Sequence, residues 1–221
     1  MCYTSGMIIL PNFVVLEGVD GTGTTTQLKL LRNRFDQGLC GVSPAAPLPL
    51  LYTTFEPTDG PVGALIRSFL RKEISLSPQT AARLFAADRN EHLYGDNGIH
   101  ERCRRGELVV CDRYVLSSLV YQGIDCGEKL PWSLNEGFPV PELLLYLDID
   151  PSISMKRIEN RAGRDIYEYL DFQVKVRERY LALVSRYGEQ GTVRIIDASQ
   201  APQEVAGEVW RALEKLPIFH I

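Results

Sequence analysis

The sequence predicts an α/β protein of three layers, in which helices cover both faces of a five-stranded parallel sheet. Five short segments are mainly apolar along their whole length, which is typical of strands that are buried on both faces. Each is followed by a longer stretch with helical periodicity, and strands that alternate with helices form parallel sheets. The expected strands are 13–16, 50–54, 108–111, 143–147 and 193–196.

The segments between these strands supply the helices. We expect helices over about 25–35, 61–72, 78–105, 153–161, 170–187 and 202–216, with a further helical region between the third and fourth strands. No internal repeat divides the chain, so we expect residues 13–221 to form a single domain, preceded by an N-terminal extension at 1–12. Ligands of such sheets bind at the carboxyl ends of the strands.

The composition is that of an ordinary globular protein, with 45% hydrophobic and 24% charged residues among 221. The net charge of -4 argues against a partner that is nucleic acid or an acidic membrane surface. No apolar run is long enough to span a membrane. The five cysteines are scattered without a Cys-x-x-Cys pair, and the apolar start has no basic residues. We therefore expect reduced thiols, no signal peptide and a cytoplasmic location.

A glycine-rich turn follows the first strand and precedes the first helix. Its residues are Gly18, Val19, Asp20, Gly21, Thr22, Gly23, Thr24, Thr25 and Thr26, which we call the phosphate loop. The spacing nearly matches G-x-x-x-x-G-K-[ST], in which backbone N–H groups and a helix N-terminus bind phosphate oxygens. The hydroxyl of Thr25 stands where this pattern places a ligand of Mg²⁺. The sequence therefore predicts binding of a nucleotide polyphosphate.

The phosphate loop departs from the pattern at one position, because Thr24 stands in place of the lysine. A threonine can donate a hydrogen bond to a phosphate but brings no charge. Two interpretations remain open at this point. Either another cation acts on the transferred phosphoryl group, or the turn binds nucleotide without catalysis.

Four further segments occur in a characteristic order and spacing with Glu17-Gly18-Val19-Asp20-Gly21. They are Phe85-Ala86-Ala87-Asp88-Arg89, Asp112-Arg113-Tyr114, Ser117-Ser118-Leu119-Val120-Tyr121-Gln122-Gly123 and Leu147-Asp148. Together they resemble the thymidylate kinase family over most of the chain. The resemblance implies a P-loop kinase fold with a short lid, transfer of a phosphoryl group from ATP to dTMP with Mg²⁺, and a homodimer.

The resemblance also implies roles for individual residues. For the dTMP base and sugar it implies stacking on Phe85, hydrogen bonds from Arg89, Ser118 and Gln122, and packing of Tyr121, with Glu56 and Pro57 at the pocket wall. Arg113 would bind the acceptor phosphate, although a salt bridge between strand and helix is the structural alternative. Asp20 would lie near the acceptor, and Asp112 would act at the metal. Glu17 either holds Mg²⁺ through water or hydrogen-bonds the turn.

Basic residues gather after the fourth strand, where the family has its lid, here at about 157–168. Arg157, Arg161 and Arg164 are candidate phosphate contacts, and Arg161 and Arg164 are our first candidates to compensate for Thr24. Cations at a helix C-terminus are the structural alternative. Asp165 and Tyr167 match family positions near the monophosphate. His92, His100 and His220 show no metal spacing, and we expect them at the surface or in helix packing.

The functional prediction is therefore phosphorylation of dTMP to dTDP. Two alternatives stay open, namely a kinase for another pyrimidine monophosphate and a non-catalytic nucleotide-binding module, which the substitution at Thr24 favours.

Overall fold

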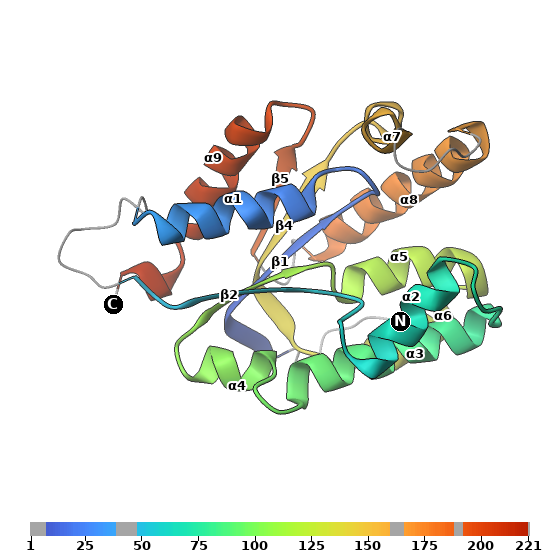
Figure 1. Cartoon of the computed structure of the whole chain (residues 1–221), viewed down its shortest axis with the longest axis horizontal. Coiled ribbons are helices and arrows are strands. Elements are labelled where there is room, and N and C mark those ends of the chain that lie inside the picture. The colour runs from blue at the N-terminus through green and yellow to red at the C-terminus, as the bar shows by residue number, and fades with distance from the viewer. Residues whose placement is uncertain (1–7, 39–47, 160–165, 188–191, 221) are drawn as a thin grey trace.

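Five parallel strands form the centre of the protein, as predicted (Figure 1). The computed structural model describes residues 8–38, 48–159, 166–187 and 192–220, and at 159 and 166–169 only the backbone. The strands lie in the order β2-β3-β1-β4-β5. Their bounds are β1 Ile9–Gly18, β2 Leu51–Phe55, β3 Leu108–Asp112, β4 Val140–Asp148 and β5 Thr192–Asp197.

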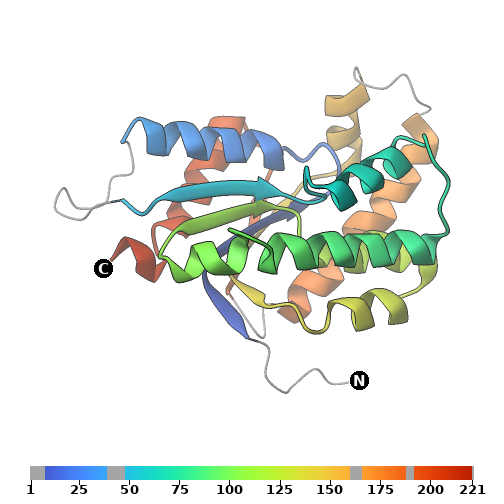
Figure 2. The ribbon, with the colours of Figure 1, turned by 60° about the horizontal axis from the view of Figure 1, so that its bottom comes forward.

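Helices cover both faces of the sheet, which completes the predicted three layers (Figures 1 and 2). Helices α1 (Thr24–Asp36) and α9 (Pro202–Leu213) pack together on one face. On the other face lie α3 (Pro78–Tyr94), α4 (Ile99–Arg104), α5 (Val115–Cys126) and α8 (Ile166–Tyr187). The shorter helices α2 (Pro61–Leu70) and α6 (Lys129–Asn135) pack against α3, and α7 (Pro151–Glu159) packs against α8. A 3₁₀ turn, Pro217–Phe219, follows α9.

The core follows from the apolar strands that the sequence predicts. Phe13 to Leu16 of β1 are fully buried between β3 and β4, and the Phe13 ring meets the Tyr114 ring edge-on at 5.1 Å. Burying such side chains on both faces stabilises each by roughly 1.5–3 kcal/mol. Because β1 lies at the centre of the sheet, the phosphate loop that follows it begins from a rigid support.

Several predicted boundaries are wrong, since β4 begins at Val140 rather than at residue 143 and α8 begins at Ile166 rather than at residue 170. Two further differences have a local cause. Strand β1 begins at Ile9 rather than at residue 13, because Pro11 and Asn12 interrupt the apolar pattern without ending the pairing. Asn12 has a positive φ of 63°, and the register with β4 shifts there. The helix expected over 78–105 is two helices, α3 and α4. Gly95 ends the first and Gly98 precedes the second, both with extended backbone. A Cβ on either would lie 2.6 or 2.7 Å from a backbone carbonyl oxygen, so this tight connection requires glycine.

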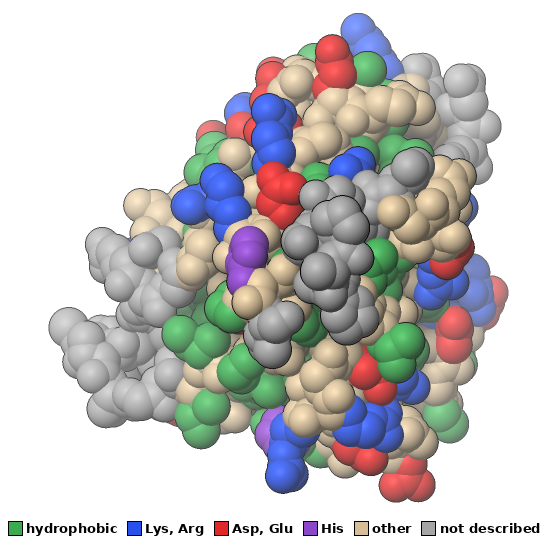
Figure 3. Space-filling model, turned by 90° about the vertical axis from the view of Figure 1, so that its left-hand side faces the viewer, with side chains coloured by type: hydrophobic (Ala, Val, Ile, Leu, Met, Phe, Trp, Pro, Cys, Tyr) green, Lys and Arg blue, Asp and Glu red, His purple; other side chains and the backbone are tan. Residues whose placement is uncertain are grey.

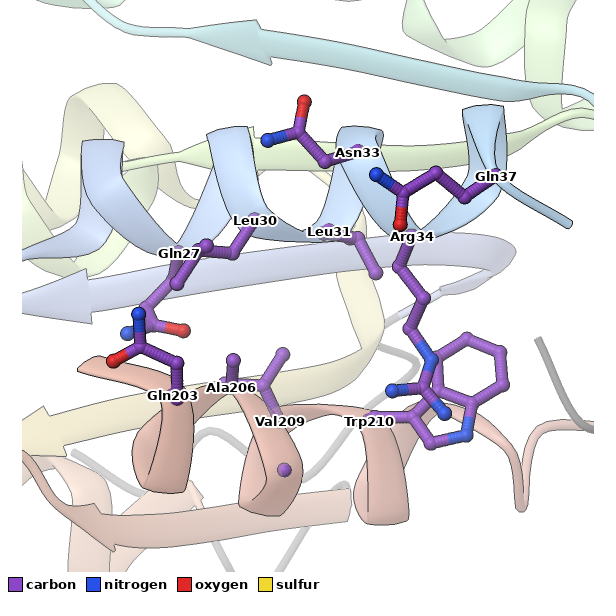
Figure 4. A pocket seen from close by; sticks show the side chains of 11 residues that line it. Gln27, Leu30, Leu31, Asn33, Arg34, Gln37, Gln203, Ala206, Val209 and Trp210 are labelled. Atoms are coloured by element: carbon purple, nitrogen blue, oxygen red, sulfur yellow. The ribbon is translucent and has the colours of Figure 1, made fainter. Parts of the chain in front are cut away.

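The end of the sheet opposite the phosphate loop has a mixed surface. In Figure 3, basic, acidic and apolar side chains are interspersed over its described residues. Within the described ranges, no helix combines the length and the apolar character that a membrane span needs. A cavity of about 400 Å³ lies between α1 and α9, and Figure 4 shows Arg34 stacked on Trp210 at its edge, 4.5 Å from guanidinium carbon to ring centroid. Among the described residues, none of those predicted for the nucleotide site lines this cavity.

Candidate active site

The phosphate loop joins β1 to α1 at the carboxyl ends of the strands, where the sequence places a ligand site (Figure 1). Gly21 and Gly23 have φ values of +78° and +106°, which residues with a side chain rarely adopt. A Cβ on Gly21 would lie 2.5 Å from the Ser154 carbonyl oxygen, so the loop also packs closely on α7. No side chain in the described part of the protein caps the N-terminus of α1, and the first turn of this helix contains no acidic residue. Its N–H groups are thus positioned to bind an anion.

The two residues expected at the metal lie together beside this helix N-terminus. The Thr25 hydroxyl donates a hydrogen bond to Asp112 Oδ2 at 2.9 Å. Asp112 ends β3, directly beside Leu16 of β1. Its other oxygen, Oδ1, is buried and has no hydrogen-bond partner among the described residues. A hydroxyl and an unpartnered carboxylate oxygen are donors that suit Mg²⁺.

A second carboxylate and a guanidinium lie beside that pair. Arg113 donates to Asp20 Oδ1 at 2.6 Å and to the Ser117 hydroxyl at 3.3 Å, and its guanidinium carbon lies 5.3 Å from the centre of the Tyr121 ring. Arg113 has φ +70°, an uncommon value for a residue with a side chain. The backbone is thus held in an unfavourable conformation that directs this side chain, a feature found at functional sites.

Glu17 lies beneath the phosphate loop and is completely buried. Its Oε1 accepts from the N–H groups of Tyr114 and Ser117 at the start of α5, at 2.9 and 3.2 Å. Its Oε2 accepts from the hydroxyls of Ser117 and Tyr180, at 2.6 and 2.9 Å. Burial raises the pKa of this carboxyl, although the hydrogen bonds and Arg113 partly offset that effect. Four donors already occupy the carboxylate, and they belong to the start of α5 and to α8. None of these four belongs to the glycine-rich turn, where a hydrogen bond from Glu17 was expected.

Arg89 lies at the centre of the predicted base pocket and is 1% exposed. Its guanidinium pairs with Glu56 Oε2 at 2.7 Å and donates to the Tyr114 carbonyl at 2.9 Å. It also donates to the Ser118 hydroxyl at 3.1 Å and to the Asn135 side chain. Phe85, one helical turn before Arg89, is half-buried. Arg89 is therefore held rigidly by the loop after β2, by the start of α5 and by α6, as a residue that positions a ligand must be.

Two other predicted pocket residues have unpaired polar atoms. The Tyr121 hydroxyl and Gln122 Oε1 are buried without a hydrogen-bond partner in the described part of the chain. Such atoms cost free energy unless a ligand or water satisfies them. The loop after β2 forms the neighbouring wall. Arg67 donates to the Pro57 carbonyl, and Asp88 accepts from the Thr58 hydroxyl at 2.6 Å.

Three residues of this site were missed by the sequence analysis. His92 was expected at the surface or in helix packing, but Nδ1 lies 3.2 Å from Glu56 Oε1 and Nε2 lies 2.6 Å from the Thr54 hydroxyl. Asn135 binds Arg89 from α6. Gln173, 153 residues after Asp20, binds it from α8. The position of His92 one turn after Arg89 is a signal that could have been used, whereas Asn135 and Gln173 lie in segments without a motif.

His92, Glu56 and Cys111 also form a mixed group whose potential metal ligands lie within 4.8 Å of one another. Each of them has a protein partner, since the Cys111 thiol donates to the Arg113 carbonyl at 3.1 Å. Burial and the nearby carboxylates Glu56, Asp112 and Glu17 raise the pKa of that thiol well above its usual range. Glu56 and His92 therefore bind each other, while the thiol of Cys111 is hydrogen-bonded to the backbone instead.

The structure describes only part of the predicted lid. Arg161, Arg164 and Asp165 lie outside the described residues, and Tyr167 lies in α8 without a described side chain. Arg157 of α7 donates to the carbonyl oxygens of Ala198 at 3.0 Å and of Thr22 at 3.4 Å. It therefore connects the phosphate loop to the segment after β5.

Comparisons with known proteins agree with this geometry. A family model described as thymidylate kinase matches residues 16–209. A protein of Treponema pallidum whose name includes thymidylate kinase is 44% identical over 175 residues, covering 79% of each chain. One of Pyrobaculum aerophilum is 40% identical and covers 94% of this chain and 98% of its own. One of Methanocaldococcus jannaschii is 34% identical, with 93% and 97% covered. The phosphate loop, Asp112-Arg113 and the buried Arg89 lie together near the carboxyl ends of the strands. The matches and this arrangement show that the chain belongs to the thymidylate kinase family.

Proposed function

We propose that this enzyme transfers the γ-phosphoryl group of ATP to the phosphate of dTMP, with Mg²⁺. The observation that carries the proposal is the adjacency of two pairs, Thr25–Asp112 and Asp20–Arg113, beside the open N-terminus of α1. One pair suits the metal and the donor polyphosphate, and the other suits an anionic acceptor. In-line transfer needs these two partners side by side.

Thr25 and Asp112 would hold the magnesium ion, which supplies charge neutralisation at the transferred phosphoryl group. The backbone N–H groups at the start of α1 bind the donor phosphates. Arg113 binds the acceptor phosphate, and Asp20 keeps its guanidinium in place. The acceptor is already an anion, so the reaction needs no strong general base. Catalysis rests on positioning and on compensation of charge.

The base pocket supports thymine as the acceptor base. Phe85 offers a flat face for stacking. The Arg89 guanidinium now donates to Glu56, Ser118, Asn135 and the Tyr114 carbonyl, so it would bind the base edge by exchanging one of these hydrogen bonds for the base. Gln122 Oε1 and the Tyr121 hydroxyl are buried atoms that a nucleotide would satisfy. Glu56, Pro57, Asp165 and Tyr167 complete the proposed dTMP site.

Compensation for the missing lysine is part of this proposal. Arg157 already contacts the phosphate loop at the Thr22 carbonyl, and Arg161 and Arg164 follow it along the chain. We expect neutralisation of Arg161 and Arg164 together to lower single-turnover transfer far more than it weakens dTMP binding. A double variant that transfers phosphate as fast as the parent would refute this compensation.

An assay of ADP release with dTMP, dUMP, dCMP and dGMP tests the proposed function. We expect dTMP to be the best acceptor, with kcat/KM for dUMP lower by about 10- to 200-fold, because one methyl group in an apolar pocket has that effect. Equal turnover of dCMP or dGMP would overturn thymidylate as the substrate. Nucleotide binding without any transfer would show instead that the protein is a non-catalytic nucleotide-binding module, the alternative based on Thr24 in place of the lysine.

We also propose a symmetric homodimer in the cytoplasm, on the strength of the family. Closed two-fold symmetry is the commonest arrangement of soluble oligomers. Sedimentation at micromolar concentration should give twice the mass of the chain, and a monomer would contradict the proposal.

A further inference from the structure

The Asp20 side chain is held between two partners from different parts of the fold. Arg113 donates to Oδ1 at 2.6 Å, and the Gln173 amide nitrogen donates to Oδ2 at 2.8 Å. The Gln173 amide oxygen accepts from the backbone N–H of the same aspartate at 3.2 Å. Gln173 is fully buried. One side chain of α8 thus binds both the backbone and the carboxylate of a phosphate-loop residue.

This pair of contacts requires an amide. The backbone N–H of Asp20 needs an acceptor, and its carboxylate needs a donor, and an amide offers both at once. A glutamate at 173 would satisfy the N–H but would bring a second carboxylate against Asp20. A methionine would fill the same space and make neither hydrogen bond.

Gln173 belongs to a face of α8 that meets the ends of two central strands. Arg177, one turn later, pairs with Asp148 at the end of β4, at 2.7 and 2.8 Å. Tyr180, nearly one turn further, donates to Glu17 near the end of β1. Residues at this spacing share one side of a helix. Since the buried Val176 fixes α8 against the core, Gln173 contacts the phosphate loop from a rigid element.

We propose that Gln173 is a positioning residue, which sets the rotamer of Asp20 and the path of the phosphate loop. Occupying Oδ2 leaves Oδ1 for a single contact with Arg113. Without Gln173, the Asp20 carboxylate can rotate and bind the guanidinium with both oxygens, which draws Arg113 away from an acceptor phosphate. The acceptor part of this inference rests on the proposed function, whereas the loop part concerns nucleotide binding alone.

Two readouts on the full-length protein test the inference, namely ADP affinity and single-turnover transfer to dTMP. We expect Gln173→Glu to lower transfer by roughly 10- to 100-fold and to weaken ADP binding by a smaller factor, because a buried hydrogen-bond group loses its partner. Gln173→Met, which introduces no charge, should show a loss of the same kind if the glutamate variant does not fold. Val174→Ala, at an exposed neighbouring position on α8, is the matched control and should leave both readouts unchanged.

A double variant separates positioning from general stabilisation of the fold. In Asp20→Asn with Gln173→Glu, the polarity of the hydrogen bond is reversed, so that the asparagine amide donates to the glutamate. We expect this double variant to transfer phosphate within about threefold of Asp20→Asn alone, because contacting residues are not additive. A loss equal to the product of the two single losses, or unchanged kinetics in Gln173→Glu and Gln173→Met, would overturn the inference. Failure of the parent to phosphorylate dTMP would overturn the proposed function instead, and ADP affinity would still decide the role of Gln173.

Discussion

Replacement of Arg113 tests the proposed acceptor site most directly. Arg113 is about a quarter exposed and pairs with Asp20 on the protein side. Its contact with Ser117 is long, at 3.3 Å, so that nitrogen can turn to a phosphate at little cost. Two charge-assisted hydrogen bonds to the acceptor are together worth about 3–6 kcal/mol. Arg113→Ala should therefore lower kcat/KM for dTMP by about 10²- to 10⁴-fold.

The backbone at Arg113 provides a control that few sites offer. At φ +70°, alanine is strained by about 1 kcal/mol, whereas glycine is not. Arg113→Gly should therefore unfold at a temperature roughly 2–4 °C higher than Arg113→Ala. Both variants lack the guanidinium and should be equally poor in steady-state assays that measure ADP release. Arg113→Lys keeps a point charge and should be intermediate.

Two results would refute this reasoning. If the glycine variant recovers activity while the alanine variant does not, the defect lies in the fold and not in the lost guanidinium. If the alanine variant has the kinetics of the parent, Arg113 is a salt bridge between strand and helix and does not bind the acceptor phosphate.

Three other changes have defined outcomes. Asp112→Asn should raise the Mg²⁺ concentration that gives half-maximal transfer by roughly tenfold, because it weakens the proposed metal site beside Thr25; an unchanged Mg²⁺ titration would exclude Asp112 as a ligand. Thr24→Lys should keep the melting temperature within about 2–4 °C of the parent, since the loop already has glycines at 21 and 23; thermal unfolding measures this. Burial raises the pKa of the Glu17 carboxyl above 4.5, so its contribution to stability is complete below that pH and falls as pH rises through the folded pKa. The difference in free energy of unfolding between the parent and Glu17→Gln should therefore decrease as the pH rises above 4.5. Chemical denaturation at several pH values measures this difference, and a constant value would contradict the raised pKa of Glu17.

The layered fold could be predicted because the strands are apolar and the helices are periodic. Residues 13–16 are all hydrophobic, as a strand that is buried on both faces requires. The start of β1 could not be predicted, because Ile9 and Leu10 belong to the strand through their pairing with β4, on the far side of the irregularity at Pro11 and Asn12. The break between α3 and α4 is marked in the sequence only by Gly95 and Gly98, within a stretch that was predicted as one helix.

The sequence predicted which residues lie together at the candidate site where a short motif contains them. The loop glycines, Asp112 and Arg113 are adjacent in sequence to the strand ends that position them. Gln173 and Asn135 could not be found in this way, because each acts on a partner far away along the chain. Their roles depend on which helices pack together, and that is a property of the folded chain alone.

The buried Glu17 has an electrostatic consequence for the direction in which an anion enters. Two helices, α1 and α5, begin at neighbouring strand ends and present partial positive charge there. At α5 that charge is cancelled internally, because Glu17 occupies the N–H groups of Tyr114 and Ser117. At α1 no carboxylate stands in the first turn. A buried carboxylate thus compensates one of the two helix dipoles, and the N–H groups of the other helix are left for an anion. If the proposed function holds, the donor polyphosphate binds at α1, on one side of Arg113, and the acceptor binds on the other side.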